Sequence, residues 1–176
     1  MNETQKIKVA IQRTRQALTL KPALGIGTGV SNVRITNGLT CEIQEGDWKM
    51  TAGMPTSVGG NGQEPTPGVY GRAALGSCLA IGYMMKAAEF EIPITSLEVK
   101  VEADFDNGAL FGTAEKYVPA GYLEIRYTIN IESDATEEEI MQLLDSADAH
   151  SPYLDVFTRA QKCVRKVNFN STEIQN

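Results

Sequence analysis

The stretch Gly68-Val-Tyr-Gly-Arg-Ala-Ala-Leu-Gly-Ser-Cys78-Leu-Ala-Ile-Gly-Tyr-Met-Met-Lys-Ala-Ala-Glu-Phe90 decides the fold, because it is apolar almost all the way round and contains no proline. It is too rich in glycine to span a bilayer reliably, and polar sequence follows soon after it. It therefore predicts a buried helix over residues 69–90, at the centre of a soluble core. Pro65 and Pro67 mark the start, since a helix cannot continue backwards through them.

One stripe of this helix combines small side chains with a thiol. At helical spacing the stripe contains Gly71, Ala74, Leu75, Cys78, Ile81, Gly82 and Met85. Because glycine and alanine carry almost no side chain, another backbone can approach the stripe closely. We therefore expect the sulfur of Cys78 to lie at a packed helix contact.

The residues before this helix predict a flexible loop and, further upstream, a sheet. Residues 53–68 are rich in glycine and proline, and a loop of this length in a compact domain is usually functional or mobile. Its position allows it to cover Cys78 or to line a pocket beside the thiol. Residues 30–52 predict a three-stranded meander whose first turn is Asn37-Gly38. That turn would place Arg34 opposite Cys41, on the inward face.

The two ends of the chain add helices and further strands. Residues 1–24 hold an amphipathic helix, predicted over residues 3–20. Residues 94–170 form a second half with two long alternating strands, a second amphipathic helix, a helical turn and a final strand. These elements are predicted at residues 94–105, 122–131, 134–147, 151–160 and 162–169, with Asp134 and Glu137 as a capping box at the start of the second helix. The element order predicts an α+β fold with antiparallel sheets around a buried central helix.

Length, charge and cysteine usage restrict the classes of function. The 176 residues are 42% hydrophobic and suit one domain, residues 1–176. A net charge of −6 without a dense basic cluster disfavours nucleic acid and anionic membranes as partners. The polar N-terminus and the three unpaired-looking cysteines predict a cytoplasmic protein, and the single histidine, His150, argues against a structural zinc site. We expect neither a metal nor a cofactor.

Residues 65–80, Pro-Thr-Pro-Gly-Val-Tyr-Gly-Arg-Ala-Ala-Leu-Gly-Ser-Cys-Leu-Ala, resemble the signature of the OsmC and organic-hydroperoxide-resistance (Ohr) family. The strand over residues 97–105, the join over residues 129–139 and the pair Ser151-Pro152 extend the resemblance to roughly residues 46–169. The resemblance implies an OsmC-like fold and an intertwined homodimer, with two sites at the interface between paired central helices. Fully equipped members reduce organic hydroperoxides with a reactive and a resolving cysteine, assisted by an arginine and a glutamate.

The resemblance implies a reduced set of functional residues in this chain. The reactive cysteine corresponds to Cys78, whereas the resolving cysteine corresponds to Ser151, immediately before Pro152. The glutamate position is Gly68, and Arg34 is the nearest arginine to the first hairpin turn, where the family places its arginine. The resemblance therefore supports the fold further than it supports the activity.

Peroxide reduction requires a thiolate, which in apolar surroundings needs a cation or a hydrogen-bond donor nearby. Arg34, Arg72 and His150 are the candidates. With Ser151 in place of a thiol, a sulfenic acid on Cys78 has no partner within the chain, so turnover requires an external thiol reductant. Cys41 and Cys163 are interpreted as residues that pack in the core.

Three functions are compatible with this pattern. The leading hypothesis is a thiol-based redox site that reduces organic or inorganic hydroperoxides in the oxidative stress response, with peroxidase activity centred on Cys78. The first alternative is a degenerate dimer that binds a small apolar ligand, in which case Cys78 is an inert buried residue. The second is a hydrolase that uses Cys78 with His150. The alternative role of Arg34, instead of activating the thiol, is a buried ion pair with a glutamate, and the alternative role of Arg72 is to cap a loop carbonyl.

Overall fold

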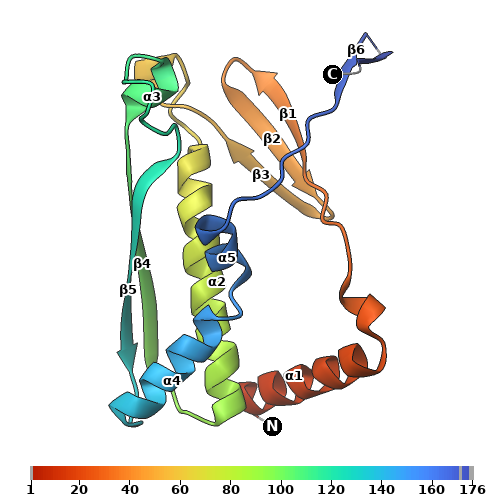
Figure 1. The fold of residues 1–176 in the computed structure, drawn as a ribbon, viewed down its shortest axis with the longest axis vertical. Helices are drawn as coiled ribbons and strands as arrows, with labels where there is room; N and C mark the ends of the chain where they lie inside the picture. Colours follow the sequence, from red (N-terminus) through yellow and green to blue (C-terminus); the bar gives the residue numbers. More distant parts are fainter. Residues whose placement is uncertain (1, 171, 175–176) are drawn as a thin grey trace.

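The computed structural model describes residues 2–170 and 172–174 (Figure 1). The helices are α1 (Glu3–Leu20), α2 (Pro67–Phe90), α3 (Asn107–Phe111), α4 (Glu137–Asp148) and α5 (Pro152–Thr158). The strands are β1 (Asn32–Asn37), β2 (Thr40–Glu45), β3 (Trp48–Ala52), β4 (Ser96–Phe105), β5 (Tyr122–Glu132), β6 (Val167–Phe169) and β7 (Thr172–Ile174). Helices and antiparallel sheets are mixed along the chain, so the predicted α+β class is confirmed.

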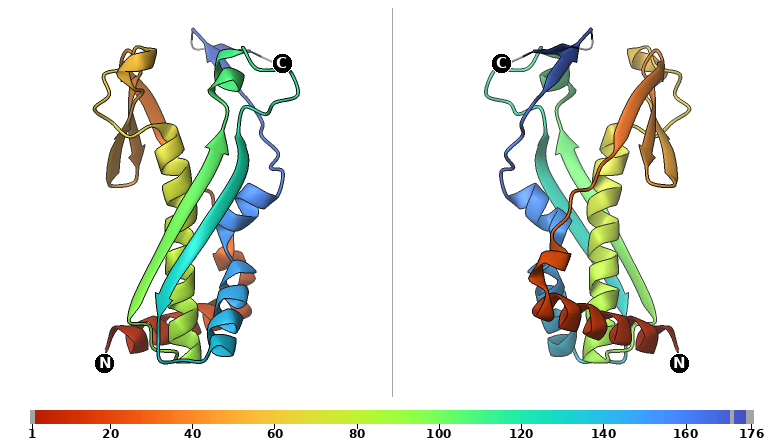
Figure 2. Two further views of the ribbon diagram at one scale, coloured as in Figure 1. Left: turned by 90° about the vertical axis from the view of Figure 1, so that its left-hand side faces the viewer. Right: turned by 90° about the vertical axis from the view of Figure 1, so that its right-hand side faces the viewer.

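Helix α2 is the central element, and it begins at Pro67, two residues before the predicted start, because proline is accommodated in the first turn of a helix. The β4–β5 hairpin runs along it, α4 and α5 pack beside it, and α1 crosses near its C-terminal end (Figures 1 and 2). The core consists of side chains from one side of α2, joined by residues of α4 and of the segment after α2. Its buried members are Leu75, Leu79, Tyr83, Ala87, Ile92, Leu143 and Ala147.

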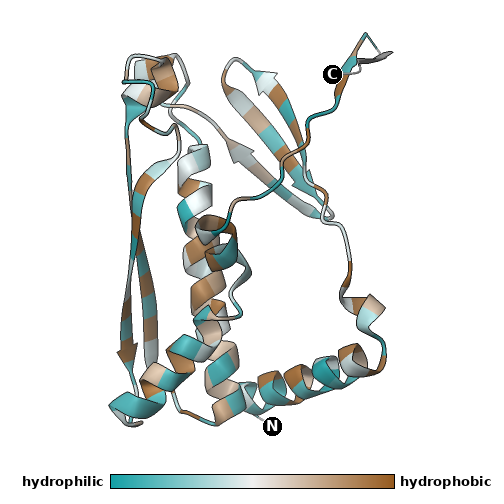
Figure 3. Cartoon of the chain, in the orientation of Figure 1, coloured by the Kyte–Doolittle hydropathy of each residue, from teal (hydrophilic) through white to brown (hydrophobic). Residues whose placement is uncertain are grey.

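The predicted burial of α2 holds for only one side of the helix. Ile81 is 61% exposed and Met85 is 45% exposed, although both are apolar. Figure 3 shows hydrophobic segments along much of α2. The cause is the arrangement of its neighbours: β4, α4 and α5 pack against the side that carries Leu75 and Leu79. On the opposite side, α1 crosses near the C-terminal end of α2 and leaves Ile81 and Met85 partly exposed.

The β4–β5 hairpin follows the predicted alternation and lies very close to α2. Val99 pairs with Ile129 and Val101 pairs with Tyr127, all of them partly buried against the core. A Cβ atom added at Gly76 would lie 3.2 Å from Cγ2 of Val101. The glycine therefore allows the helix backbone to approach the sheet to a distance that a larger residue would prevent.

The meander β1–β2–β3 forms as predicted, but its register differs from the prediction. Asn37 pairs with Thr40, so the two turn residues are Gly38, at a left-handed φ of 53°, and Leu39. An irregularity after Ile35 then shifts the ladder by one residue, and Arg34 lies opposite Glu42 instead of Cys41. The prediction that Arg34 points inward is therefore wrong: its side chain is 80% exposed. Figure 1 shows the meander set apart from the β4–β5 hairpin.

Two predictions for the C-terminal half also need correction. The capping box of α4 is formed by Thr136 and Glu139, whose side chains each bond the other's backbone N–H, and not by Asp134 and Glu137. Of the strand predicted over residues 162–169, only β6 is a strand, and it pairs with β7. Cys163 precedes β6 in an irregular, exposed segment, so it is not a core residue, whereas Cys41 is half-buried.

Candidate functional site

Cys78 lies midway along α2 and is half-buried in a cavity of about 690 Å³, called here the Cys78 cavity. Helix α1 contributes one side of the cavity, α2 its floor, and the corner between α4 and α5 the other side. It is lined by Ile11, Arg15, Ala74, Ser77, Cys78, Ile81, Gly82, Met85, Lys86, Glu89, Ala147, His150, Ser151, Pro152 and Tyr153. Most of the α2 residues that line the cavity belong to the stripe predicted from helical spacing. A concave surface therefore surrounds the thiol.

Ser151 is the polar side chain in contact with the sulfur. Its Oγ lies 3.5 Å from Sγ of Cys78, and the serine is buried. The same oxygen accepts a hydrogen bond of 3.3 Å from the backbone N–H of Leu154 and so caps α5. Because that N–H occupies a lone pair of the oxygen, the hydroxyl hydrogen stays available for the sulfur. Ser151 can therefore donate to Cys78, and the donated bond would be strongest to a thiolate.

His150 lines the same cavity but bonds elsewhere. Its Nδ1 lies 2.8 Å from the carbonyl oxygen of Ser146. Since a carbonyl only accepts, Nδ1 carries the hydrogen, and in the neutral ring Nε2 is left as an acceptor. The structure thus brings together three of the candidate residues, Cys78, Ser151 and His150, with the hydroxyl and not the imidazole at hydrogen-bond distance from the thiol.

The two arginines predicted to activate the thiol lie outside the Cys78 cavity. Arg34 forms an ion pair of 3.1 Å with Glu42 on the outer face of the meander. Arg72 precedes Cys78 by six residues, which at 3.6 residues per turn directs it to another side of α2. Its Nη1 lies 3.4 Å from the position that a Cβ atom would take at Gly68, at the start of the helix. Within a single chain, neither guanidinium reaches the cavity.

The cations of the cavity are Arg15 and Lys86, which the sequence reading missed. Arg15 of α1 donates two bonds to the carboxylate of Glu89, the one from Nη2 at 2.8 Å. Lys86 lies 3.1 Å from the same carboxylate, with its side chain only 14% exposed. Burial lowers the pKa of Lys86, and the positive charge of Arg15 lowers it further. No local pattern signals this cluster, because Arg15 and Glu89 are 74 residues apart.

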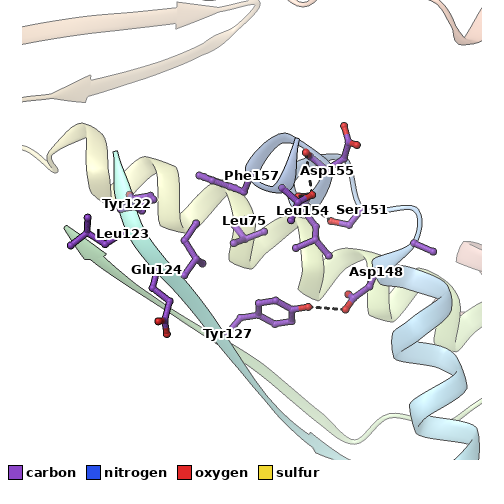
Figure 4. A pocket seen from close by; sticks show the side chains of 13 residues that line it. Leu75, Tyr122, Leu123, Glu124, Tyr127, Asp148, Ser151, Leu154, Asp155 and Phe157 are labelled. Atoms are coloured by element: carbon purple, nitrogen blue, oxygen red, sulfur yellow. Dashed lines mark hydrogen bonds between the residues drawn. The ribbon is translucent and has the colours of Figure 1, made fainter. Parts of the chain in front are cut away.

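A second cavity, of about 650 Å³, lies between β5 and α5 (Figure 4). Ser151 and Leu75 line it together with aromatic and acidic side chains of β5, α4 and α5. At its edge, the hydroxyl of Tyr127 donates to Asp148 Oδ2 at 2.9 Å. Tyr83 donates to Oδ1 of the same carboxylate at 2.7 Å. Asp148 thus ties α2 and β5 to the corner that carries His150 and Ser151.

The residues described, 2–170 and 172–174, contain no group of three or more His, Cys, Asp or Glu side chains that could hold a metal ion. All three cysteines are free. No helix in these residues combines the length and the apolar composition needed to cross a lipid bilayer. The site itself places a thiol beside a hydroxyl in a mainly apolar cavity.

Comparison with solved structures finds similar folds. An OsmC-like protein from Mycoplasma pneumoniae is 16% identical with a TM-score of 0.64, over 75% of this chain and 88% of that chain. An organic hydroperoxide resistance protein OsmC from Legionella pneumophila is 20% identical with a TM-score of 0.56, over 75% and 90%. An organic hydroperoxide resistance protein from Elizabethkingia anophelis is 18% identical with a TM-score of 0.54, over 74% and 88%. At these identities the likeness shows the fold alone.

Comparison with curated proteins finds no match. The family model described as OsmC-like protein matches residues 60–164, which include α2, the β4–β5 hairpin and the Ser151 corner. This match covers more than half of the chain and confirms the resemblance seen in residues 65–80. The chain that places Cys78 against Ser151 therefore belongs to the OsmC-like protein family.

Proposed function

We propose that the protein reduces organic hydroperoxides at Cys78, in a cycle that an external thiol completes. The observation that carries the proposal is the half-buried sulfur of Cys78, 3.5 Å from the hydroxyl of Ser151, in a cavity lined mostly by apolar side chains. The apolar lining favours an organic over an inorganic hydroperoxide as substrate. The names of the Legionella and Elizabethkingia structures, both organic hydroperoxide resistance proteins, support the same substrate class.

The first chemical step is oxidation of the sulfur. The thiolate of Cys78 attacks the outer peroxide oxygen, and the O–O bond breaks. The sulfur becomes a sulfenic acid, and the alkoxide that leaves takes up a proton and departs as an alcohol. The hydroxyl of Ser151 would stabilise the thiolate before this step by donating a hydrogen bond to it.

The second half of the cycle needs two equivalents of a thiol. Ser151, at the position of the resolving cysteine, cannot form a disulfide with Cys78. An external thiol therefore attacks the sulfenic sulfur, which releases water and forms a mixed disulfide. A second thiol displaces Cys78 and leaves as the oxidised disulfide, so two thiols supply the two electrons that reduce the peroxide.

Stopped-flow consumption of an alkyl hydroperoxide by the reduced protein tests this proposal. The native protein and Cys163→Ser, which removes an exposed thiol away from the cavity, should consume one equivalent rapidly. Cys78→Ser should not. Equal rates for native protein and Cys78→Ser would remove the enzyme proposal.

Two other functions rest on separate observations. The apolar lining of the Cys78 cavity suits a small apolar ligand bound without chemistry, which native mass spectrometry of the purified protein would detect alongside an unreactive Cys78. The Nε2 atom of His150 is suited to act as a general base for acyl transfer. Hydrolysis of an activated ester by the native protein but not by His150→Gln would reveal this activity.

We also propose a cytoplasmic homodimer. Ile81, Met84 and Met85 form an exposed apolar face on α2, and such contiguous faces are typical of protein interfaces. Three free cysteines suit a reducing compartment.

A further inference from the structure

Asp148 is the last residue of α4, a position that disfavours a negative charge. The carbonyl groups at the C-terminus of a helix carry a partial negative charge, which repels a carboxylate. The last turn of α4 contains no basic side chain that would compensate for it. The stability of α4 alone therefore does not explain the aspartate, and its contacts outside the helix become informative.

Two phenols from different elements hold the carboxylate of Asp148. The hydroxyl of Tyr83 on α2 donates to Oδ1 at 2.7 Å, and the hydroxyl of Tyr127 on β5 donates to Oδ2 at 2.9 Å (Figure 4). Tyr83 is only 1% exposed, so water cannot easily replace its bond. Because each oxygen is held from a different side, the carboxylate cannot rotate or shift without losing a bond. We call these three side chains the Asp148 clamp.

A tight turn connects the clamp to Ser151. The backbone N–H of Ser151 donates to the carbonyl oxygen of Asp148 at 3.1 Å, and the hydroxyl of Ser151 lies 3.5 Å from Sγ of Cys78. The corner between α4 and α5 thus contacts α2 at two points, at Tyr83 through Asp148 and at Cys78 through Ser151. The bond from the N–H of Leu154 joins the Ser151 hydroxyl to α5, and not to α2. A movement of Asp148 would therefore change the distance between the hydroxyl and the sulfur.

We propose that Asp148 is a positioning residue, which Tyr83 and Tyr127 hold in place so that the hydroxyl of Ser151 stays against the sulfur of Cys78. The inference deepens the proposed function, on whose site it rests, by naming the groups that fix this contact. Asp148 does not line the Cys78 cavity and acts only through Ser151. Tyr83 packs in the core, so the clamp is compatible with a partner on the exposed apolar face of α2.

A disulfide between residues 78 and 151 tests the inference without peroxide. Ser151→Cys protein is equilibrated with mixtures of reduced and oxidised glutathione, and mass spectrometry of its peptides gives the oxidised fraction at each ratio. The equilibrium constant for disulfide formation rises with the effective concentration of one thiol at the other. Adding Tyr83→Phe and Tyr127→Phe, which keep both rings and the charge of Asp148, should lower this constant about tenfold, because both bonds of the clamp are lost.

Tyr122→Phe in the Ser151→Cys protein is the matched control. Tyr122 also belongs to β5, and its hydroxyl donates to the carbonyl oxygen of Gly68 at 3.1 Å instead of to Asp148. This variant should leave the equilibrium constant unchanged. If circular dichroism shows that the variant with both phenylalanines does not fold, Tyr127→Phe alone replaces it. We expect a smaller decrease from this single change, since the bond from Tyr83 remains.

Three results would overturn the inference. The first is an equilibrium constant that is the same with and without the clamp hydroxyls, which would leave Asp148 a purely structural role even if the free energy of unfolding falls. The second is a constant that rises when these hydroxyls are removed, and the third is that Ser151→Cys forms no disulfide at any glutathione ratio. Peroxide consumption by the native protein does not enter this measurement. Failure of the inference is therefore distinguishable from failure of the proposed function.

Discussion

At the scale of single residues, the side chain of Ser151 sets the chemistry beside the sulfur of Cys78. Its hydroxyl lies 3.5 Å from the sulfur of Cys78 and can hydrogen-bond to it. Unlike a second thiol, a hydroxyl cannot form a disulfide with the oxidised sulfur. The structure therefore places a hydroxyl, and not a second thiol, in contact with Cys78.

Ser151→Cys should convert the protein to a two-cysteine cycle. One equivalent of alkyl hydroperoxide should then produce a disulfide between residues 78 and 151, because the two side chains are already in contact. Mass spectrometry of peptides from non-reduced protein would detect it. Ser77→Cys is the matched control, since it also lines the cavity but is adjacent to Cys78 along the helix. A sulfenic acid that persists in Ser151→Cys would contradict the prediction.

We expect Tyr83 and Tyr127 to make the stability of the fold decrease at alkaline pH. Burial raises the pKa of both phenols, and their hydrogen bonds to Asp148 raise it further. Both therefore hold their protons more tightly in the folded than in the unfolded state. Their contribution is complete below the unfolded pKa of about 10 and is lost as pH rises above it, with a slope of about 1.4 kcal/mol per pH unit for each.

Denaturant unfolding of the native protein and Tyr83→Phe at increasing pH would measure this slope. The Tyr83→Phe variant should lose stability more gradually above pH 10. In the native protein, the ultraviolet absorbance of tyrosinate should show that two of the six tyrosines ionise only on unfolding. Tyr117→Phe, at a site that is 84% exposed, should retain the native slope. Parallel slopes for all three proteins would refute the assignment.

At the scale of elements, the close approach of α2 to β4 depends on Gly76. A Cβ atom there would lie 3.2 Å from Val101 Cγ2, so a branched side chain cannot fit without displacing the strand. We expect Gly76→Val to lower the free energy of unfolding by about 1–3 kcal/mol, although valine has the higher helix propensity. Urea unfolding would measure it, with Ala73→Val at an exposed position of α2 as the control. An unchanged or raised stability for Gly76→Val would show that the space between Gly76 and Val101 admits a branched side chain.

Long periodic elements could be predicted from the sequence, whereas their ends and partners could not. The alternation of β4 and β5 fixes which face of each strand is apolar, since a slip of one residue would expose every apolar side chain. The first hairpin lacks such a penalty because its strands are exposed, and there the position of Arg34 was wrong by one residue. In the capping box, Asp134 with Glu137 and Thr136 with Glu139 have the same spacing, and the sequence does not decide between them.

The candidate site was predicted in part for a related reason. Cys78 and Ser151 were found because each lies in a recognisable local motif, and the structure brings them into contact. Arg15 and Glu89 were not found, because their pairing depends on how α1 crosses α2, which no short-range pattern encodes.

At the scale of the whole molecule, much apolar surface stays exposed. The open side of α2 and the outlying meander both carry it, as Ile81, Met84, Met85, Val33, Ile35 and Trp48. Figures 1 and 2 show the meander and α1 standing apart from each other, joined by an extended connector. Burial of such faces against a second copy would remove them from water, at about 25 cal/mol for each Å² of apolar surface.

The proposed homodimer predicts a concentration-dependent assembly that a single charge on α2 disrupts. Sedimentation equilibrium of the native protein should give twice the 19.1 kDa mass of one chain. Ile81→Asp should shift it toward the monomer with unchanged helix content, because an unpaired carboxylate buried at the interface costs far more than one in water. Gln142→Asp, which adds the same charge on an exposed position of α4, should remain dimeric. A native protein that stays monomeric at the highest concentrations would contradict the homodimer.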